Sequence, residues 1–313
     1  MKVIQKNGKI YLQNTEEIIS NIIMEPPKNF SLINNTEETV DFFNQVITVF
    51  NSENFNGTFV FNLNKIKCIT ADAIMYMNAL ALNRLSTRSG QKILLGWPKN
   101  KKCKNFLKRC GIKKYLSSGN GNSVKTNNYY TITGGKKADV DCIREIGLFT
   151  CDKLNIQIKD LDFITSTFVE LMNNTEQHAY DINVDKFWYV FIEDTKTSVK
   201  YTFLDTGKGI PETMRKSFSD NIHDLLPIIE EDHSYFIFEA LKGDIPRSSS
   251  EKAYRNTGLP EIYKNYKEKK LSKLKIISCR GVCTFHDSSR SQPNLKNMKV
   301  NFCGTLFTWE VKK

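Results

Sequence analysis

Residues 117–137, SSGNGNSVKTNNYYTITGGKK, are rich in Gly, Ser and Asn and divide the 313-residue chain into two parts with different patterns. A segment of this composition is typical of a connection between folded units. The chain is also longer than one average domain requires, so two hydrophobic cores are expected. We therefore predict domains at residues 1–118 and 140–313, joined by a linker at 119–139. Within that linker the β-prone residues 129–132 could pair with a flanking sheet.

Hydrophobic residues make up 40% of the chain and charged residues 25%, a composition that folded proteins have and that excludes wholesale disorder. The N-terminal residues lack the apolar core and small-residue cleavage site of a secretion signal, and no window approaches about 18 uninterrupted apolar residues. We therefore expect a soluble, cytoplasmic protein that does not bind a membrane.

The eight cysteines do not follow the dense spacing of a disulfide framework, and a chain of this length does not need one. Reduced thiols are therefore expected. Three of them, Cys279, Cys283 and Cys303, could form a zinc site with a nearby histidine, His286. The lone Cys-x-x-x-Cys, however, lacks the second pair of ligands that makes such a motif specific, so free thiols are favoured.

Lysine and arginine outnumber the acidic residues by 45 to 34, which gives a net charge of +11. This excess could favour nucleic acid, an acidic protein or a phosphate-rich ligand. The densest basic cluster, residues 99–114, also spaces Phe106, Leu107 and Ile112 as one face of a helix does. We therefore interpret the cluster mainly as the solvated face of a helix, with nucleic-acid binding as the less favoured alternative.

The first part of the chain alternates predicted strands and helices, which indicates an α/β layer. The strands are expected at residues 9–13, 58–66 and 91–97, and the helices at 39–50, 71–85 and 101–109. The order of strand, short polar turn, helix, Gly, strand, helix and Gly-Ile over residues 56–116 resembles the STAS domain of anti-sigma-factor antagonists. The resemblance implies a STAS-like α/β fold with a role in partner binding or regulation.

The turn at residues 70–73 departs from the STAS family, in which a phosphorylatable serine stands at this place. Here the turn reads Thr-Ala-Asp-Ala, so Ala71 and Ala73 carry no hydroxyl. Asp72 could supply a fixed negative charge that imitates a phosphate in part, and Thr70 is the one nearby hydroxyl. We therefore expect the fold without the phosphoserine switch.

The second part places two predicted helices, at 142–154 and 158–180, before its predicted strands, which is typical of an α+β sandwich. The strands are expected at 187–193, 200–204, 274–279 and 304–312. The second helix carries Glu170, Asn174 and His178, which are four residues apart and hence on one face. An amide oxygen such as that of Asn174 suits Mg²⁺ bound together with substrate phosphates, and Glu170 could polarise an attacking water or hydroxyl.

Three further segments follow along the chain, and the first two have features that suit a nucleotide. Residues 205–209, Asp-Thr-Gly-Lys-Gly, follow a predicted strand, so the carboxylate can accept a hydrogen bond from an adenine amino group while two glycines permit close approach. Residues 255–262, RNTGLPEI, open a predicted helix whose first N–H groups can hold phosphate oxygens. A Gly-Thr pair at residues 304–305 lies in the last predicted strand.

In their order along the chain, these four segments resemble the N box, the DxGxG box, the G2 box and the Gly-Thr pair of the GHKL ATPases. This Bergerat-fold superfamily contains histidine kinases, anti-sigma serine kinases, gyrases and heat-shock chaperones. The resemblance implies an α/β sandwich that binds ATP and Mg²⁺ under an ATP lid, here residues 211–255 with Gly243 as a hinge. It also implies Glu170 as the catalytic residue and Asn174 as the metal ligand. The nucleotide-binding residues that it implies are Asn174, His178, Asp205, Gly207, Gly209, Arg255, Gly258, Leu259, Gly304 and Thr305.

These expectations favour an ATP-binding protein that hydrolyses ATP or transfers its γ-phosphate, for example as an anti-sigma-type serine kinase. Two alternatives stay open, a non-catalytic nucleotide-dependent switch and a nucleic-acid-associated ATPase that uses residues 99–114. A sensor histidine kinase is disfavoured because the first histidine of the chain is His178, inside the N box. A protein partner of the STAS-like domain or of the lid, and a homo-oligomer, are both compatible with the sequence.

Overall fold

A computed structural model shows a mixed α/β protein that contains both parallel and antiparallel sheets. The chain forms two compact units, Met1–Gly119 and Asn120–Lys313. The structure describes residues 2–6, 9–13, 19–53, 55–87, 91–110, 124–125, 128–177, 187–213, 232–243, 258–287 and 292–313. Within these ranges no helix has both the length and the apolar character needed to cross a bilayer.

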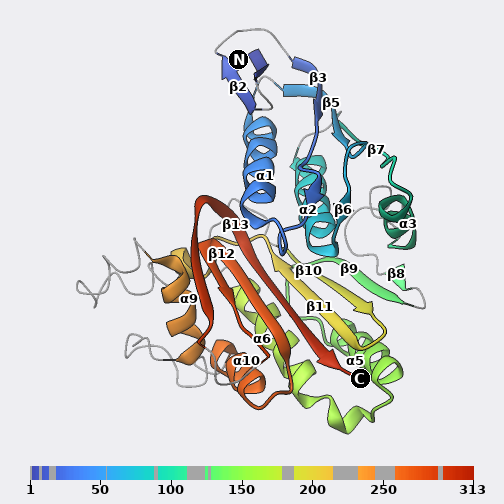
Figure 1. Cartoon of the computed structure of the whole chain (residues 1–313), viewed down its shortest axis with the longest axis vertical. Helices are drawn as coiled ribbons and strands as arrows, with labels where there is room; N and C mark the ends of the chain where they lie inside the picture. Colours follow the sequence, from blue (N-terminus) through green and yellow to red (C-terminus); the bar gives the residue numbers. More distant parts are fainter. Residues whose placement is uncertain are drawn as a thin grey trace. The chain divides into compact units, whose positions relative to one another are not determined.

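The first unit consists, in chain order, of β1 (Lys2–Lys6), β2 (Lys9–Gln13), β3 (Ile19–Met24), β4 (Asn29–Phe30), α1 (Thr36–Asn51), β5 (Phe55–Asn62), β6 (Cys68–Ile69), α2 (Ala71–Thr87), β7 (Lys92–Gly96) and α3 (Lys101–Arg109). Its main sheet is parallel, with the strand order β3-β5-β7 (Figure 1). A short parallel pair, β4 with β6, and an antiparallel hairpin, β1 with β2, are its other strand pairs among the described residues.

An aromatic cluster joins α1 to the sheet and to α2. Phe43 of α1 lies edge-on to Tyr76 of α2, with ring centroids 4.8 Å apart. Phe50 of α1 meets Phe59 of β5 with the same centroid separation, 4.8 Å, and all four rings are buried. Because the three parallel strands are neighbours in their chain order, right-handed connections place α1 and α2 on the same face of the sheet.

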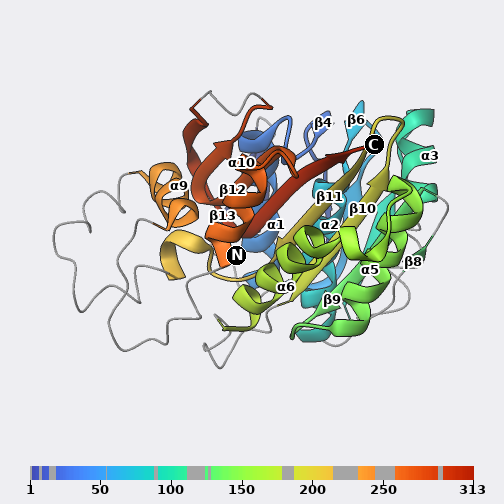
Figure 2. The same cartoon turned by 90° about the horizontal axis from the view of Figure 1, so that it is seen from below.

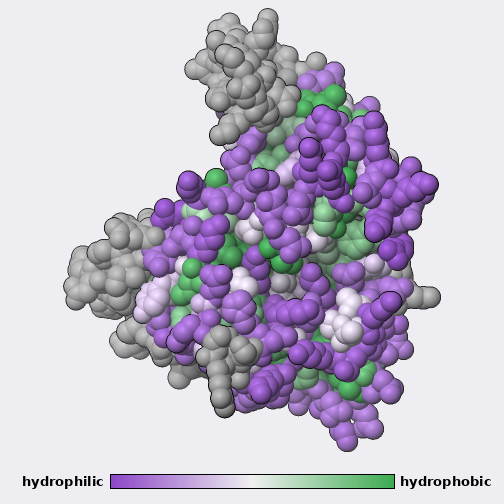
Figure 3. Space-filling view, viewed as in Figure 1, coloured by the Kyte–Doolittle hydropathy of each residue, from purple (hydrophilic) through white to green (hydrophobic). Residues whose placement is uncertain are grey.

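The opposite face of this sheet is more exposed. Ile23, Val60 and Leu94 are register partners on β3, β5 and β7, and the side chains of Ile23 and Leu94 are 59% and 51% exposed. Elsewhere the surface of the described residues is largely hydrophilic, with scattered apolar patches, on the side that Figure 3 presents. Since parallel sheets are usually covered on both faces, this row is an apolar surface that α1 and α2 leave uncovered.

Helix α3 is amphipathic, as its sequence predicts. Cys103 and Leu107 are buried, and the Asn100 side chain caps the helix by accepting two N–H groups of its first turn. The exposed side chains include Lys101, Lys102, Lys104 and Lys108. The part of the basic cluster that lies in α3 is therefore a solvated helix face, while residues 111–114 lie outside the described residues.

The turn at residues 70–73 is closed by a buried carboxylate. Asp72 is fully buried, and its Oδ1 accepts the N–H of Leu32 at 2.6 Å and the Thr70 hydroxyl at 2.9 Å. The carboxylate thus ties the start of α2 to the loop after β4. The fixed charge that Asp72 could supply in place of a phosphate is therefore not presented to a partner, because its side chain is buried.

The second unit consists, in chain order, of β8 (Val124–Lys125), β9 (Tyr129–Gly135), α5 (Val140–Leu154), the 3-10 helix η1 (Ile158–Asp160), α6 (Asp162–Gln177), β10 (Trp188–Asp194), β11 (Ser198–Asp205), α9 (His233–Lys242), α10 (Gly258–Lys267), β12 (Ser272–Thr284) and β13 (Asn294–Lys312). Its strands form one antiparallel sheet in the order β12-β13-β11-β10-β9-β8. Helices α5, α6, α9 and α10 lie on one face of this sheet (Figure 2).

The core of the second unit lies between the sheet and these helices. Tyr201 of β11 stacks on Trp309 of β13, with ring centroids 5.3 Å apart and planes 10° apart. Phe168 of α6 packs against Trp309 at 5.3 Å, and the Tyr201 hydroxyl donates to Thr150 of α5 at 3.1 Å. Two helices are thereby fixed on the middle strands of the sheet.

The segment expected as a linker, residues 119–139, is partly a strand of this sheet. Residues 129–135 form β9, which pairs with β10. The β-prone residues 129–132 therefore pair with a flanking sheet, and the expectation of a connecting segment is wrong for this part. The pairing partner lies about 60 residues further along the chain, so the choice between linker and strand depends on a long-range contact.

The prediction of an ATP lid at residues 211–255 is wrong for residues 233–242. These form α9, whose Phe236, Ile237 and Leu241 belong to the core of the second unit. Gly243, expected as a hinge, is the left-handed residue that ends α9, with φ of 80°. The other residues of the expected lid, apart from 211–213 and 232, lie outside the described residues.

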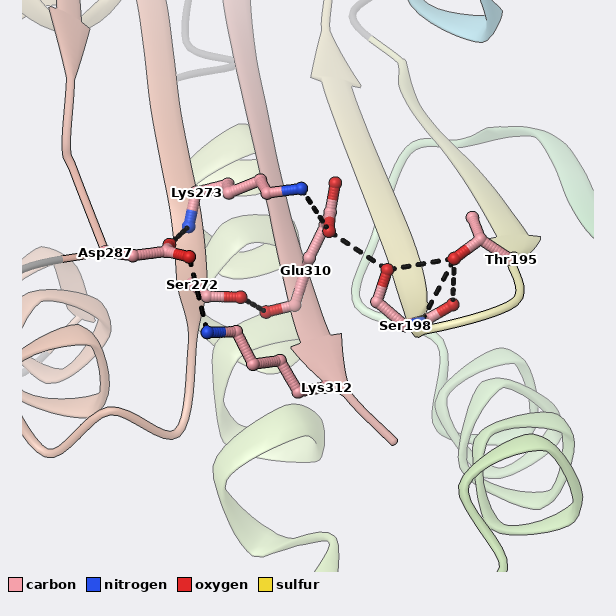
Figure 4. Close-up of polar contacts among 7 residues, drawn as sticks. All are labelled: Thr195, Ser198, Ser272, Lys273, Asp287, Glu310 and Lys312. Atoms are coloured by element: carbon pink, nitrogen blue, oxygen red, sulfur yellow. Dashed lines mark hydrogen bonds and ion pairs between the residues drawn. The ribbon is translucent and has the colours of Figure 1, made fainter.

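A polar network holds one end of the sheet (Figure 4). The Glu310 carboxylate on β13 accepts the Ser198 hydroxyl of β11 at 2.9 Å and pairs with Lys273 of β12 at 3.1 Å. The Ser272 hydroxyl of β12 donates to the Glu310 backbone carbonyl at 3.0 Å. Three neighbouring strands are therefore tied together at this end.

Replacing Asp72 by Ala should lower the free energy of unfolding by about 1–3 kcal/mol, because the buried Leu32 N–H and the Thr70 hydroxyl lose their acceptor. Asp41→Ala is a matched control, since Asp41 accepts a hydrogen bond from Gln45 one turn along α1 and is partly exposed. Denaturant unfolding of the full chain measures both variants. Equal stability of the two would contradict the bracing role of Asp72.

Candidate functional site

Asp205, Thr305 and Ser278 form a row across three neighbouring strands. Asp205 of β11 is the register partner of Thr305 of β13, which is in turn the partner of Ser278 of β12. Two residues away along the strands, the row that contains Phe203 and Phe307 belongs to the core under the helices. Because side chains alternate between faces along a strand, the Asp205 row lies on the same helix-covered face.

The loop after β11 is held by short contacts to this row. Asp205 Oδ1 accepts the N–H of Gly207 at 2.7 Å, which orients the carboxylate. Gly209 has φ of 89°, and a Cβ there would lie 2.8 Å from Ser278 Oγ. The N–H of Ile210 donates to the same Ser278 Oγ at 2.8 Å. The path of the loop over β12 therefore depends on glycine at position 209.

Gly304 makes the close approach of β13 to β11 possible. Its φ is 122°, and a Cβ there would collide with the carbonyl oxygen of Asp205. The residue lies in a bulge of the β12–β13 pair, where the register shifts after Ser278. Gly304 thus has a backbone role that brings Thr305 beside Asp205.

Glu170, Asn174 and Gly258 form a second group, where α6 meets the start of α10. A Cβ at Gly258 would lie 2.6 Å from Glu170 Oε2 and 3.5 Å from Asn174 Nδ2. Because Gly258 is the first residue of α10, the positive end of the helix dipole lies at the Glu170 carboxylate. Helix α6 packs through Phe168 on the same face of the sheet as the Asp205 row, and Leu259 is buried in that core. The predicted N box therefore meets the start of the predicted G2 helix.

Cys279 and Cys283 near the site are free, buried thiols. Among the described residues, no group of three or more His, Cys, Asp or Glu side chains is placed to hold a metal. Burial raises the pKa of the Cys279 thiol to about 12 and also raises that of Cys283, so both thiols are protonated at neutral pH. The eight cysteines are not paired with one another, in agreement with the free thiols predicted from the sequence.

Ser278 is a site residue that the motifs do not predict. The available signal is a serine within an apolar predicted strand, residues 274–279, where a buried hydroxyl requires a partner. That partner, Thr305, becomes a neighbour only through the register of β12 with β13.

Comparison of the chain with protein-family models, with curated proteins and with solved structures finds no match. The assignment of a function therefore rests on the motifs and on the geometry of the two groups. His178 and Arg255, which the motifs also implicate, lie outside the described residues.

Gly304→Ala should lower the free energy of unfolding by about 2–4 kcal/mol, since the added methyl group combines an unfavourable positive φ with a collision at the Asp205 backbone. Gly147→Ala is the matched control, because Gly147 lies inside α5 and a Cβ there would lie 3.3 Å from a movable Leu161 methyl group. Denaturant unfolding compares the two variants. If Gly304→Ala is no less stable than Gly147→Ala, the strand does not need glycine at this position.

Proposed function

We propose that the second unit binds Mg-ATP as GHKL ATPases do and hydrolyses it or transfers its γ-phosphate, while a STAS-like first unit binds a partner or regulates the reaction. The observation that carries this proposal is the meeting of four sequence-distant segments in two groups on one face of one sheet. Asp205 meets the Gly-Thr pair, and Glu170 meets the start of α10. An antiparallel sheet covered by helices on that face is compatible with the Bergerat fold.

The Asp205 row suits the adenine base. A carboxylate is an acceptor for the exocyclic amino group, and the Thr305 hydroxyl can donate to or accept from a ring nitrogen. Because the Gly207 N–H holds one carboxylate oxygen, the orientation of the Asp205 side chain is set before a base binds. Preorganised polar groups of this kind give a binding site its specificity.

The Glu170 group suits the phosphates. The first N–H groups of α10 can hold phosphate oxygens, and Asn174 lies beside the same helix start. The amide oxygen of Asn174 is a ligand type that Mg²⁺ accepts, and bound Mg²⁺ would neutralise part of the phosphate charge. Nucleotide-bound Mg²⁺ commonly needs one or two protein ligands, so a site without an acidic cluster among the described residues fits it.

Glu170 favours an enzyme over a non-catalytic switch. A carboxylate at the start of α10 repels an incoming phosphate, so it does not add to the affinity for nucleotide. For hydrolysis or phosphotransfer the same carboxylate can accept the proton of the attacking water or hydroxyl. The switch function uses the same two groups and differs in requiring no base at position 170.

Asp205→Asn should weaken the binding of Mg-ATP by about 5- to 100-fold, because the adenine amino group loses a charged acceptor. The variant should stay folded, since an amide oxygen can still accept the Gly207 N–H. Asp194→Asn is the control, because Asp194 ends β10 at the opposite end of the sheet and pairs with Lys313. Calorimetry that finds unchanged affinity for both Asp205→Asn and Asn174→Ala would exclude this site.

Glu170→Gln should lower turnover by about 10² to 10⁴ while the affinity for Mg-ATP stays the same or rises slightly, because the base is lost and a like charge is removed. Glu176→Gln on the same helix is the control, since Glu176 accepts the N–H of Ala138 instead. Steady-state phosphate release and calorimetry measure the two effects. If the wild-type protein binds ATP but neither hydrolyses it nor phosphorylates any tested partner, the non-catalytic switch replaces the enzyme as the proposed function.

A further inference from the structure

Ser278 connects three segments of the second unit. It is fully buried in β12, and its hydroxyl contacts polar groups of two other segments. Ser278 Oγ accepts the N–H of Ile210 at 2.8 Å and lies 3.3 Å from the Gly304 carbonyl oxygen and 3.2 Å from Thr305 Oγ1. Ile210 begins the helical turn that follows the loop after Asp205, whereas the other two groups belong to β13.

The hydrogen-bonding capacity of Ser278 limits the Thr305 hydroxyl to two arrangements. A serine hydroxyl can donate one hydrogen bond and accept two, and the Ile210 N–H already occupies one acceptor position. The Gly304 carbonyl can only accept. When it takes the Ser278 proton, Thr305 donates to Ser278, and otherwise Thr305 accepts that proton. In both arrangements Ser278 sets what the Thr305 hydroxyl can offer to a ligand.

Ser272 is a structural serine on the same strand. It is also buried, and its hydroxyl donates to the backbone carbonyl of Glu310 at 3.0 Å (Figure 4). This bond joins two neighbouring strands at the end of the sheet that lies away from Asp205. Ser278 differs because it holds the helical turn at Ile210 as well as the neighbouring strand.

We propose that Ser278 is a positioning residue of the nucleotide site, which holds the helical turn that begins at Ile210 and sets whether the Thr305 hydroxyl offers the adenine ring a donor or an acceptor. This role rests on the proposed function, because it is defined by a base that binds at Asp205 and Thr305. Ser278 acts through these two segments and does not itself contact the nucleotide. The tight packing of Gly209 on Ser278 adds to the effect, since any displacement of Ser278 also moves the loop.

The first measurement compares Ser278→Ala with Ser272→Ala by calorimetry with Mg-ATP. Ser278→Ala should bind about tenfold more weakly than the wild type, and Ser272→Ala should bind as the wild type does. Both variants lose a buried hydroxyl on the same strand, so thermal unfolding of both separates positioning from general destabilisation. If Ser278→Ala does not fold, Ser278→Cys keeps a weak donor and acceptor and should bind with an intermediate affinity.

The second measurement is a double-mutant cycle between Ser278→Ala and Thr305→Ala. Because Ser278 acts partly through Thr305, the double variant should lose less affinity than the product of the two single effects. Two results would overturn the role of Ser278 but leave the proposed function standing, provided that the wild type binds Mg-ATP. One is full additivity of the two single effects, and the other is an unchanged affinity of the Ser278→Ala variant. A wild type without measurable affinity for Mg-ATP would overturn the proposed function and this role with it.

Discussion

The pairing of β11 with β13 is the interaction on which the second unit depends. Its register runs without a shift from Ser198 opposite Lys312 to Asp205 opposite Thr305, with the Tyr201–Trp309 stack between these ends. A slip of one residue would turn every side chain of one strand to the other face, which would remove an aromatic ring from the core and Asp205 from the helix-covered side. One register therefore determines both the core and the candidate site.

The two ends of this strand pair use polar residues in different ways. At one end, Glu310 is satisfied by Ser198 and Lys273, so the polar groups there stabilise the sheet itself (Figure 4). At the other end, glycines at positions 209 and 304 adopt positive φ and bring backbone segments close to one another. The first end holds the strands in register, and the second places an oriented carboxylate and a hydroxyl side by side.

Local sequence patterns predicted much of the fold and part of the candidate site. Helix α3 was predicted with its observed bounds, because its buried and charged positions alternate with helical periodicity. The same spacing rule put Glu170 and Asn174 on one face of α6. The patterns failed at residues 233–242, because an apolar helix of ten residues can pack into a core or cover a ligand, and its own sequence does not distinguish the two. The role of Asp72 was also missed, since its carboxylate accepts the N–H of Leu32, which lies 40 residues earlier in the chain.

By itself, the sequence determined the local elements and the four motif segments, because helical spacing, strand propensity and the conformational freedom of glycine act within a few residues. The tertiary structure decided which of these segments meet. Ser278 contacts Thr305, 27 residues away, through strand register, and Gly258 meets Glu170 through the packing of α10 beside α6. Register and helix packing are set by burying apolar side chains from the whole unit together, so no local stretch of sequence contains this information.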